Sequence, residues 1–196
     1  MVAEQLDLQR VADCLARPRD AHGREELTRA GAYNRSMNFW EKTKRNHGLE
    51  HGTISLLLSR MPHDQPMAGY SIPAGFFVIG DLTTEQIRET ADEALSRMQA
   101  GEADLAISPF CGTNIVVGAA LATAGTLLGY RLGGRGMRGV NRAFSNAALA
   151  IVASRPVGRT VQQRYTTSAD VGTMSTVDIT RYQLGKVTIH WVSTAF

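Results

Sequence analysis

A helix with ionisable side chains on its hydrophobic face is the feature that most constrains this chain. Hydrophobic periodicity predicts a helix from Ser36 to Arg60. One face of it carries a heptad stripe with a second row beside it: Trp40, His47, His51, Ile54, Leu58 and Met61. Glu50 lies next to this stripe, three residues after His47. Burying two imidazoles and a carboxylate without partners is unfavourable, so the pattern predicts metal coordination or a hydrogen-bonded network.

The residues from His47 to His51 read H-x-x-E-H, the inverted form of a zinc-protease motif. Two histidines four residues apart on a helix can bind one cation, and the glutamate of such a motif acts as a general base. Gly48 and Gly52 lie in mid-helix, where each costs about 1 kcal/mol relative to alanine. We therefore expect another backbone to approach closely there. The alternative is a pair of core histidines hydrogen-bonded to Glu50 and to nearby carbonyl groups.

The remaining periodicity predicts an α+β fold, with a small α/β layer packed on the H-x-x-E-H helix. Residues Ile72 to Ile79 form an apolar run that is typical of a buried strand. Thr83 and Gln86 have the spacing of a capping box, which opens a helix that stops at Gly101. Residues Ala103 to Ile107 are predicted to form a second strand.

The C-terminal part predicts a β-hairpin with one buried face. From Ser175 onward apolar and polar residues alternate around a turn at Gln183 to Gly185. The apolar positions are Val177, Ile179, Tyr182, Val187, Ile189 and Trp191. His190 falls on the face opposite Ile189 and Trp191, so it is predicted to lie at the surface.

A long apolar segment lies between these parts. Residues Ile115 to Tyr130 carry no charge, and with Gly112 to Asn114 they reach about the length that crosses a bilayer. The segment contains Gly118-x-x-x-Ala122 and Gly125-x-x-x-Gly129, a small-residue spacing that lets membrane helices pack closely. The alternative is a buried Ala/Gly-rich helix of a soluble core.

A second apolar segment, Ala143 to Ala153, is too short to span a membrane alone. It would complete a helical hairpin if its helix continued through Arg155 and Pro156 with the charges snorkelling. The connecting loop is basic: Arg131, Arg135, Arg138 and Arg142. These charges favour a cytoplasmic loop, whereas an N-terminal domain without a signal is also expected in the cytoplasm. A re-entrant or interfacial hairpin, or packing against partner membrane subunits, would satisfy both expectations.

These elements predict four regions: an N-terminal arm (1–35), a metal-motif α/β domain (36–111), an apolar membrane-type helical hairpin (112–165) and a C-terminal β-hairpin (166–196). The net charge of +3 is mild and the basic residues do not interleave with aromatic ones, so no nucleic-acid partner is expected. No secretory signal pattern opens the chain. Cys14 and Cys111 are expected to be reduced thiols of a cytoplasm-facing protein.

Two motifs carry a resemblance to a known family. They are H-G-L-E-H-G-T-I from His47 to Ile54, and C-G-T-N from Cys111 to Asn114, which leads directly into the apolar helix. Together they resemble an uncharacterised bacterial family, the domain of unknown function 6391 type, found in Chloroflexota-like and cyanobacterial genomes. The likeness runs from about Phe39 to the C-terminal hairpin, and it includes Gly75 to Asp81 and Thr166 to Asp170.

More loosely, the chain is similar to a bacterial membrane family labelled, from its motifs, as a metal-dependent enzyme. That family shares H-x-x-E-H-x-x-I and C-G-T-[SN] at the mouth of a membrane helix. A histidine is common there three residues before the cysteine, where this chain has Ser108. The difference removes one ligand from the pattern.

The resemblance implies that the two motifs converge on one metal site. His47, His51 and Cys111 would supply two nitrogens and a sulfur, a set suited to zinc with one open position. Glu50 would orient a ligand or act as general base, and Thr113 or Asn114 would hydrogen-bond a bound oxygen. Alternatively, Cys111 is a nucleophile at a helix N-terminus with a histidine as its base, or a small buried residue in a tight turn.

Two functions follow from these expectations. The first is a zinc-dependent hydrolase of the cytoplasmic membrane with its main domain facing the cytoplasm, which predicts an accessible cleft beside Glu50. The second is a non-catalytic accessory or structural subunit of a membrane complex, whose cluster would be buried without a pocket. Both predict membrane lipids or membrane proteins as partners, in a homo- or hetero-oligomer. A third, a regulatory ligand-binding module, has less support, because the glycines near Gly133 to Gly136 lack the strand and lysine of a phosphate-binding loop.

Overall fold

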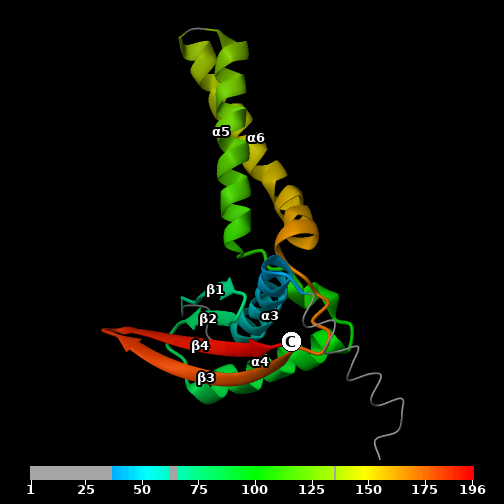
Figure 1. The fold of residues 1–196 in the computed structure, drawn as a ribbon. Helices are drawn as coiled ribbons and strands as arrows, with labels where there is room; N and C mark the ends of the chain where they lie inside the picture. The colour runs from blue at the N-terminus through cyan, green and yellow to red at the C-terminus, as the bar shows by residue number, and fades with distance from the viewer. Residues whose placement is uncertain (1–36, 62–65, 135) are drawn as a thin grey trace, which may run out of the picture. The chain divides into compact units, whose positions relative to one another are not determined.

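The computed structural model describes residues 37–61, 66–134 and 136–196. The predicted N-terminal arm with Cys14, and the loop residue Arg135, lie outside the described residues. Figure 1 shows the order of the elements along the chain.

The predicted histidine-bearing helix is confirmed as α3, Phe39–Arg60. Asn38 caps it, because its side chain accepts the backbone N–H of Glu41 at 2.9 Å. The helix begins three residues later than expected, where this cap satisfies the first free N–H groups. It ends before Pro62, which cannot continue a helix.

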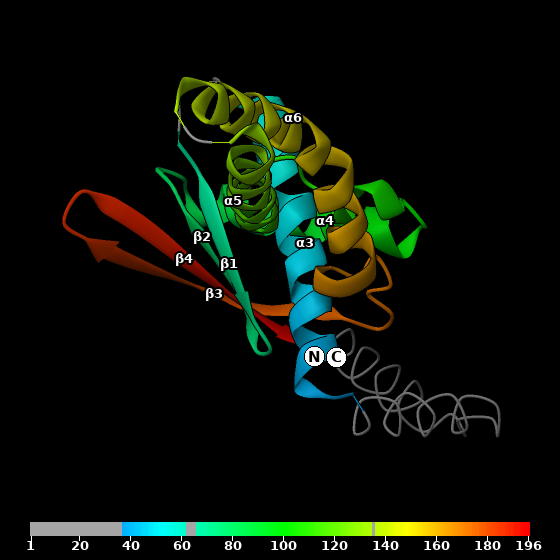
Figure 2. The ribbon, with the colours of Figure 1, turned by 90° about the horizontal axis from the view of Figure 1, so that it is seen from above.

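Four antiparallel strands form one sheet, in the order β1-β2-β4-β3. The strands are β1 (Ala68–Ile72), β2 (Gly75–Ile79), β3 (Ser175–Leu184) and β4 (Val187–Ala195). The C-terminal hairpin is confirmed, and it joins the sheet because β4 pairs with β2, with Phe77 opposite Trp191. These two rings pack with their centroids 4.6 Å apart. Figure 2 shows the four strands side by side.

Two local predictions are wrong. Residues Ile72 to Ile79 are not one strand, because the chain turns at Pro73 and Ala74, and Ile72 pairs with Gly75 across the turn. Proline has no N–H to donate to a ladder and therefore favours this break. Residues Ala103 to Ile107 are not a strand either: Ala103–Ala106 form a 3-10 turn, η1. The expected strand–helix–strand unit is thus a hairpin followed by α4 (Thr84–Gln99) and this turn.

The core lies between one face of the sheet and the two helices α3 and α4. Helix α4 starts at the predicted capping box, in which Thr83 accepts the N–H of Gln86 and donates its own N–H to the Gln86 side chain. The core residues include Leu49, Leu56, Phe76, Val78, Ile87, Ala91, Ala94, Ile179 and Val192. Helices on one side and an antiparallel sheet on the other give the expected α+β class.

The prediction that His190 lies at the surface is wrong. Its side chain is 0% exposed, whereas its neighbours Ile189 and Trp191 are only partly buried. In the sheet His190 pairs with Val78, which belongs to the core face. The faces of β4 are therefore the reverse of the predicted ones, because Thr188, His190 and Val192 point toward the helices. Trp191 lies on the face of the sheet that points away from the helices, where its ring packs against that of Phe77.

The apolar segment forms a helical hairpin of α5 (Gly112–Gly133) and α6 (Met137–Val161). Helix α6 continues through Arg155 and Pro156, which was the condition for a hairpin. The small residues of α5 face α6: a β-carbon at Gly125 would lie 2.8 Å from the carbonyl oxygen of Asn146, and one at Gly129 would lie 2.6 Å from that of Arg142. The glycine spacing therefore serves packing within the hairpin, which both views show as adjacent helices (Figures 1 and 2).

The large apolar side chains of the hairpin face outward. On α5 the exposed ones are Ile115, Val116, Leu127, Leu128, Tyr130 and Leu132, and on α6 they are Met137, Val140, Phe144, Leu149, Ile151, Val152 and Val157. In the described part of the chain, α5 is the one helix that is long and apolar enough to cross a membrane. At 1.5 Å per residue it extends about 33 Å, close to the thickness of a bilayer's hydrocarbon core. The buried soluble-core alternative does not fit a helix that buries Gly129 alone.

Polar contacts fix the base of the hairpin to the α/β part. Helix α6 runs into a single π-helical turn, η2 (Gln162–Thr166). The Gln162 side chain accepts the N–H of Ser108 at 3.0 Å and donates to the carbonyl oxygen of Ser108 and to Asn114. The hairpin is thus clamped at the loop that precedes α5, which is where the candidate site lies.

Candidate metal centre

Both histidines of α3 project toward the start of α5. Their ring centroids are 4.3 Å apart, as expected for neighbours at i and i+4. The stripe that carries them does not face the core: Trp40 is 52% exposed, and Ile54 and Leu58 are only partly buried. The core face of α3 is instead built from Leu49, Leu56 and Leu57, which leaves the histidine stripe free to form a site.

A backbone carbonyl holds each imidazole in place. The Nδ1–H of His47 donates to the carbonyl oxygen of Thr166 at 2.8 Å, and the Nδ1–H of His51 donates to that of Ala106 at 2.8 Å. Each ring therefore presents Nε2 with its lone pair to the site. This arrangement, with a hydrogen bond on one ring nitrogen and the other free to bind, is that of metal-ligating histidines in general.

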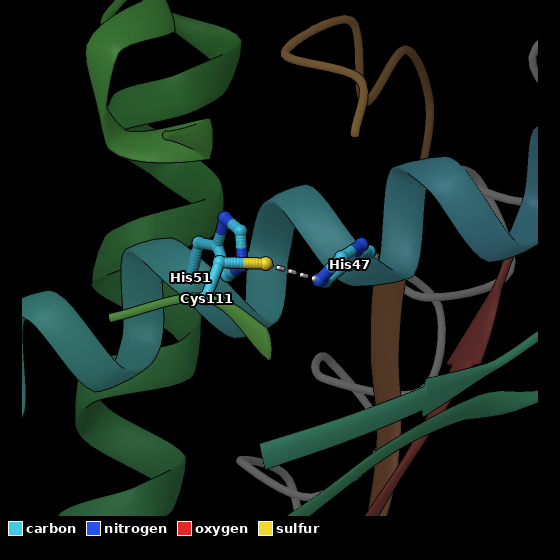
Figure 3. Close-up of side chains that lie close together, drawn as sticks. All are labelled: His47, His51 and Cys111. Atoms are coloured by element: carbon cyan, nitrogen blue, oxygen red, sulfur yellow. Dashed lines mark hydrogen bonds between the residues drawn. The ribbon is translucent and has the colours of Figure 1, made fainter. Parts of the chain in front are cut away.

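The sulfur of Cys111 completes the cluster. Cys111 is the N-cap of α5, and its Sγ accepts the backbone N–H of Thr113 at 3.4 Å. The Sγ also lies 3.4 Å from Nε2 of His47, the contact drawn in Figure 3. Burial opposes ionisation of the thiol, but the nearby His51 imidazole and the groups of Thr113 outweigh it, so the pKa of Cys111 is lowered. A thiolate is the form that binds metal.

The three side chains fit a metal ion. The ligand atoms of His47, His51 and Cys111 all lie within 4.8 Å of one another. Tetrahedral zinc with bonds of about 2.0–2.3 Å separates its ligand atoms by roughly 3.3–3.7 Å. The distance between Sγ of Cys111 and Nε2 of His47 is already in this range. Small side-chain rotations would bring Nε2 of His51 to the same separation. Within the described chain, the buried Nε2 of His51 has no hydrogen-bond partner, as expected for a nitrogen that binds a metal ion.

The close backbone approach predicted at Gly48 is confirmed. A β-carbon there would overlap the carbonyl oxygen of Ser168. The N–H of Ser168 also donates to the carbonyl oxygen of Lys44 at 2.9 Å, so this segment is fixed across α3. Because Thr166 is two residues away, the glycine allows the segment to bring the carbonyl oxygen of Thr166 to His47.

Glu50 is buried beside the cluster, with 5% of its surface exposed. Its Oε2 accepts a hydrogen bond from the Ser71 hydroxyl at 2.6 Å. On β1, the Cα of Gly69 packs against its carboxylate, which leaves no room for a β-carbon. Burial raises the pKa of Glu50 by more than the Ser71 hydrogen bond and the charge of His47 lower it. A raised pKa makes a carboxylate a better proton acceptor.

A cleft of about 740 Å³ adjoins the cluster. His47, Glu50, His51 and Cys111 all line it. The other lining residues are Ile54, Ser55, Leu58, Ser59, Met67, Ala68, Gly69, Ser108, Phe110, Gly112 and Ile115. A volume of this order is typical of small-molecule sites. The cluster is therefore one end of an accessible cleft.

The predicted oxygen-binding residues occupy different places. Thr113 contributes its backbone N–H to Cys111, and its hydroxyl lies 3.5 Å from that of Thr166. The side-chain amide of Asn114 donates to the carbonyl oxygens of Ser108 and Pro109. Asn114 lines a second cavity of about 710 Å³, between η1 and α6, and is absent from the lining of the cleft. Ser108, three residues before Cys111, lines both cavities.

Sequence reasoning missed four contributors to the site. The carbonyl groups of Ala106 and Thr166 orient the histidines, and no side-chain pattern reveals a backbone acceptor. Ser71 and Gly69 position Glu50 from β1. A weak signal for them exists, since glycine in a strand indicates a close approach by another group.

Comparison with known proteins gives a family but no activity. The model of the family described as Domain of unknown function (DUF6391) matches residues 42–179. An uncharacterized protein of Picosynechococcus sp. is 38% identical over 87 residues, which cover 40% of this chain and 42% of that protein. The match therefore spans less than half the length of that relative. No solved structure matches the chain.

Proposed function

The chain belongs to the DUF6391 family, and we propose that it is a membrane-anchored, zinc-dependent hydrolase. One observation carries the proposal. Two imidazole nitrogens and a sulfur converge at one end of a cleft whose lining also includes a buried carboxylate, Glu50. A structural zinc site is closed by four protein ligands, whereas three ligands beside a cleft are typical of a catalytic one.

His47, His51 and Cys111 would hold the ion. When bound, zinc supplies Lewis-acid chemistry toward a carbonyl group and an attacking water. The carbonyl oxygens of Thr166 and Ala106 keep both imidazoles in the tautomer that leaves Nε2 free. The N–H of Thr113 stabilises the Cys111 thiolate from the first turn of α5.

Glu50 would act as the general base. Its carboxylate takes a proton from water while the water oxygen forms a bond to the substrate's carbonyl carbon. The same proton then passes to the leaving nitrogen or oxygen as the C–N or C–O bond breaks, which yields a carboxylic acid and an amine or alcohol. Ser71 and Gly69 keep the carboxylate in one position during both transfers.

The apolar hairpin would anchor the enzyme in the cytoplasmic membrane, with the α/β part on the cytoplasmic side. The exposed apolar side chains of α5 and α6 support this proposal, as does the placement of arginines near both ends of the hairpin, Arg131 and Arg138 at one and Arg155 and Arg159 at the other. Arginine side chains at helix ends reach the lipid head groups. Membrane lipids are then the immediate partners.

The first test is the zinc content of the full chain purified in detergent, measured by elemental analysis. We expect about one zinc per chain in the wild type, and loss of zinc in His51→Ala and in Cys111→Ser. Ser55→Ala is the matched control, because Ser55 lines the same cleft but belongs to no ligand set. Thermal unfolding in the apo state separates loss of a ligand from loss of the fold.

Zinc-free wild-type protein that also fails to take up added zinc would contradict the hydrolase. The cluster would then be a hydrogen-bonded structural core, and the exposed hairpin would identify an accessory subunit of a membrane complex.

A further inference from the structure

We propose that the substrate of this site carries a long alkyl or acyl chain, which lies along the apolar wall of the cleft with its amide or ester bond at the metal-binding end. This inference rests on the proposed hydrolase function and adds the class of substrate.

The lining of the cleft divides into two kinds. The ionisable groups His47, Glu50, His51 and Cys111 come from one turn of α3 and from the start of α5. The large apolar side chains are Ile54, Leu58, Met67, Phe110 and Ile115. Ile54 and Leu58 follow His51 at intervals of three and seven residues, so the apolar wall leads away from the cluster along α3. An extended chain with a polar end fits this sequence of contacts.

The apolar wall is continuous with the surface of the membrane hairpin. Ile115 lies in the first turn of α5, and its side chain is both part of the cleft and 72% exposed. Phe110, in the loop before α5, also lines the cleft and is 77% exposed. With α5 in the bilayer, these residues lie where head groups meet hydrocarbon. A hydrocarbon chain can then enter the cleft from the lipid without crossing water.

The charges of the described lining do not favour a polyanionic substrate. Among the residues that the structure describes, Glu50 is the one acidic residue in the lining of the cleft, and this lining contains no lysine or arginine. In this described lining, a phosphorylated or polyanionic substrate would meet no cationic side chain apart from the histidines. The serines, Ser55, Ser59 and Ser108, are the remaining polar side chains. An uncharged tail therefore suits the cleft better than a charged one.

A peptide is the competing class, and the sheet provides the argument for it. Strand β1 pairs with β2 alone in the described sheet, and its residues Ala68 and Gly69 line the cleft. A peptide could add to this free edge. However, binding along the apolar wall needs no peptide backbone. The two substrate classes also predict a different dependence of affinity on the length of the alkyl chain.

The test uses the cobalt-loaded full chain in lipid nanodiscs, with the visible absorption of Co²⁺ as the readout. Three hydroxamates are titrated: acetohydroxamate, hexanohydroxamate and decanohydroxamate. Burial of each methylene contributes about 0.8 kcal/mol, so we expect the half-saturating concentration to fall roughly fourfold per methylene until the cleft is filled. Leu58→Asn is titrated under the same conditions. Partition of the probes into the lipid is the same for both proteins, so it does not contribute to the difference between wild type and variant. We expect this variant to lose at least about tenfold in affinity for decanohydroxamate and to bind acetohydroxamate unchanged.

The control is Leu184→Asn, because Leu184 is exposed on the C-terminal hairpin and outside the cleft. Equal effects of chain length in wild type and Leu58→Asn would overturn the acyl-chain proposal while leaving the metal site intact. Tighter binding of acetyl-Ala-Ala hydroxamate than of decanohydroxamate would overturn it in favour of a peptide. Failure of the wild type to bind cobalt would instead overturn the proposed function, and with it this inference.

Discussion

The Cα of Gly69 is packed against the carboxylate of Glu50, so that a β-carbon at position 69 would overlap Oε1. Strand β1 thereby fixes the position of the proposed base from outside the helix that carries it. Ser71, on the same side of β1, holds the second carboxylate oxygen. The glycine is thus a positioning residue for Glu50.

Gly69→Ala is expected to displace Glu50 and to reduce hydrolysis without removing the metal. General-base catalysis contributes about 10²–10⁴-fold, so Glu50→Gln should lower kcat by that factor, and Gly69→Ala by roughly tenfold or more. The measurement is turnover of 4-nitrophenyl decanoate together with zinc content. Gly118→Ala is the matched control, because a β-carbon there meets the Ser154 hydroxyl oxygen at an ordinary 3.4 Å. Loss of zinc in Gly69→Ala would show that the strand supports the ligands and not the base.

Gly48→Ala is expected to destabilise the protein. Alanine gains about 1 kcal/mol over glycine in a helix, but overpacking against the fixed carbonyl of Ser168 costs about 1–3 kcal/mol or more. We therefore expect a lower Tm in detergent and weaker zinc binding, since the displaced segment includes the partner of His47. In Gly52→Ala the nearest atom is the Ala94 Cβ at 3.3 Å, so its effect should be much smaller. Equal Tm values for both variants would contradict this account.

Ala124→Arg is expected to reduce membrane association. Ala124 is exposed near the middle of α5, where an arginine in hydrocarbon costs about 2.5–3.5 kcal/mol. On a helix surrounded by water the same change would have almost no effect. The measurement is the fraction of protein retained in membranes after alkaline carbonate washing. Ala100→Arg, at an exposed position just after α4, is the control. Undiminished retention of Ala124→Arg would place α5 outside the bilayer core.

His190 is expected to make stability depend on pH. Burial and the nearby charge of Arg181 lower its pKa below the ordinary value of about 6.5. The unfolded state then takes up the proton first, so the stability due to neutral His190 is present above about pH 6.5 and is lost as the pH falls through the lowered pKa. The Tm of the wild type should therefore fall more between pH 8 and pH 5 than that of His190→Leu. An identical pH dependence in the two proteins would show that His190 ionises freely in the folded state.

Most of the elements could be predicted from local sequence, whereas their pairing could not. The helix of His47, the capping box of Thr83 and the C-terminal hairpin each depend on neighbouring residues. The pairing of β2 with β4 joins residues more than a hundred positions apart, and no periodicity encodes it. The face of His190 was predicted wrongly for the same reason: alternation gives two faces, but the core face depends on which strand lies next to it.

The side-chain part of the site was easier to predict than its backbone part. The spacing of His47 and His51 follows from helix geometry, and their proximity to Cys111 was implied by resemblance alone. The role of the Ala106 carbonyl group could not have been predicted. The sequence predicted a strand in this segment, whereas the segment forms the turn η1, in which this carbonyl group points toward His51. Ile54 and Leu58 show a related limit, since an apolar stripe can line a cleft as well as a core.

The pairing of β2 with β4 also sets the order in which the protein can assemble during synthesis. The ribosome releases His47, His51 and β2 first, then the whole apolar hairpin, and β4 last. Strand β2 therefore cannot pair with β4 until α5 and α6 have left the exit tunnel. Thr166, whose carbonyl group orients His47, also emerges only after the hairpin. A nascent chain thus contains the apolar hairpin before the centre is complete, and the site is completed only after the hairpin has been made.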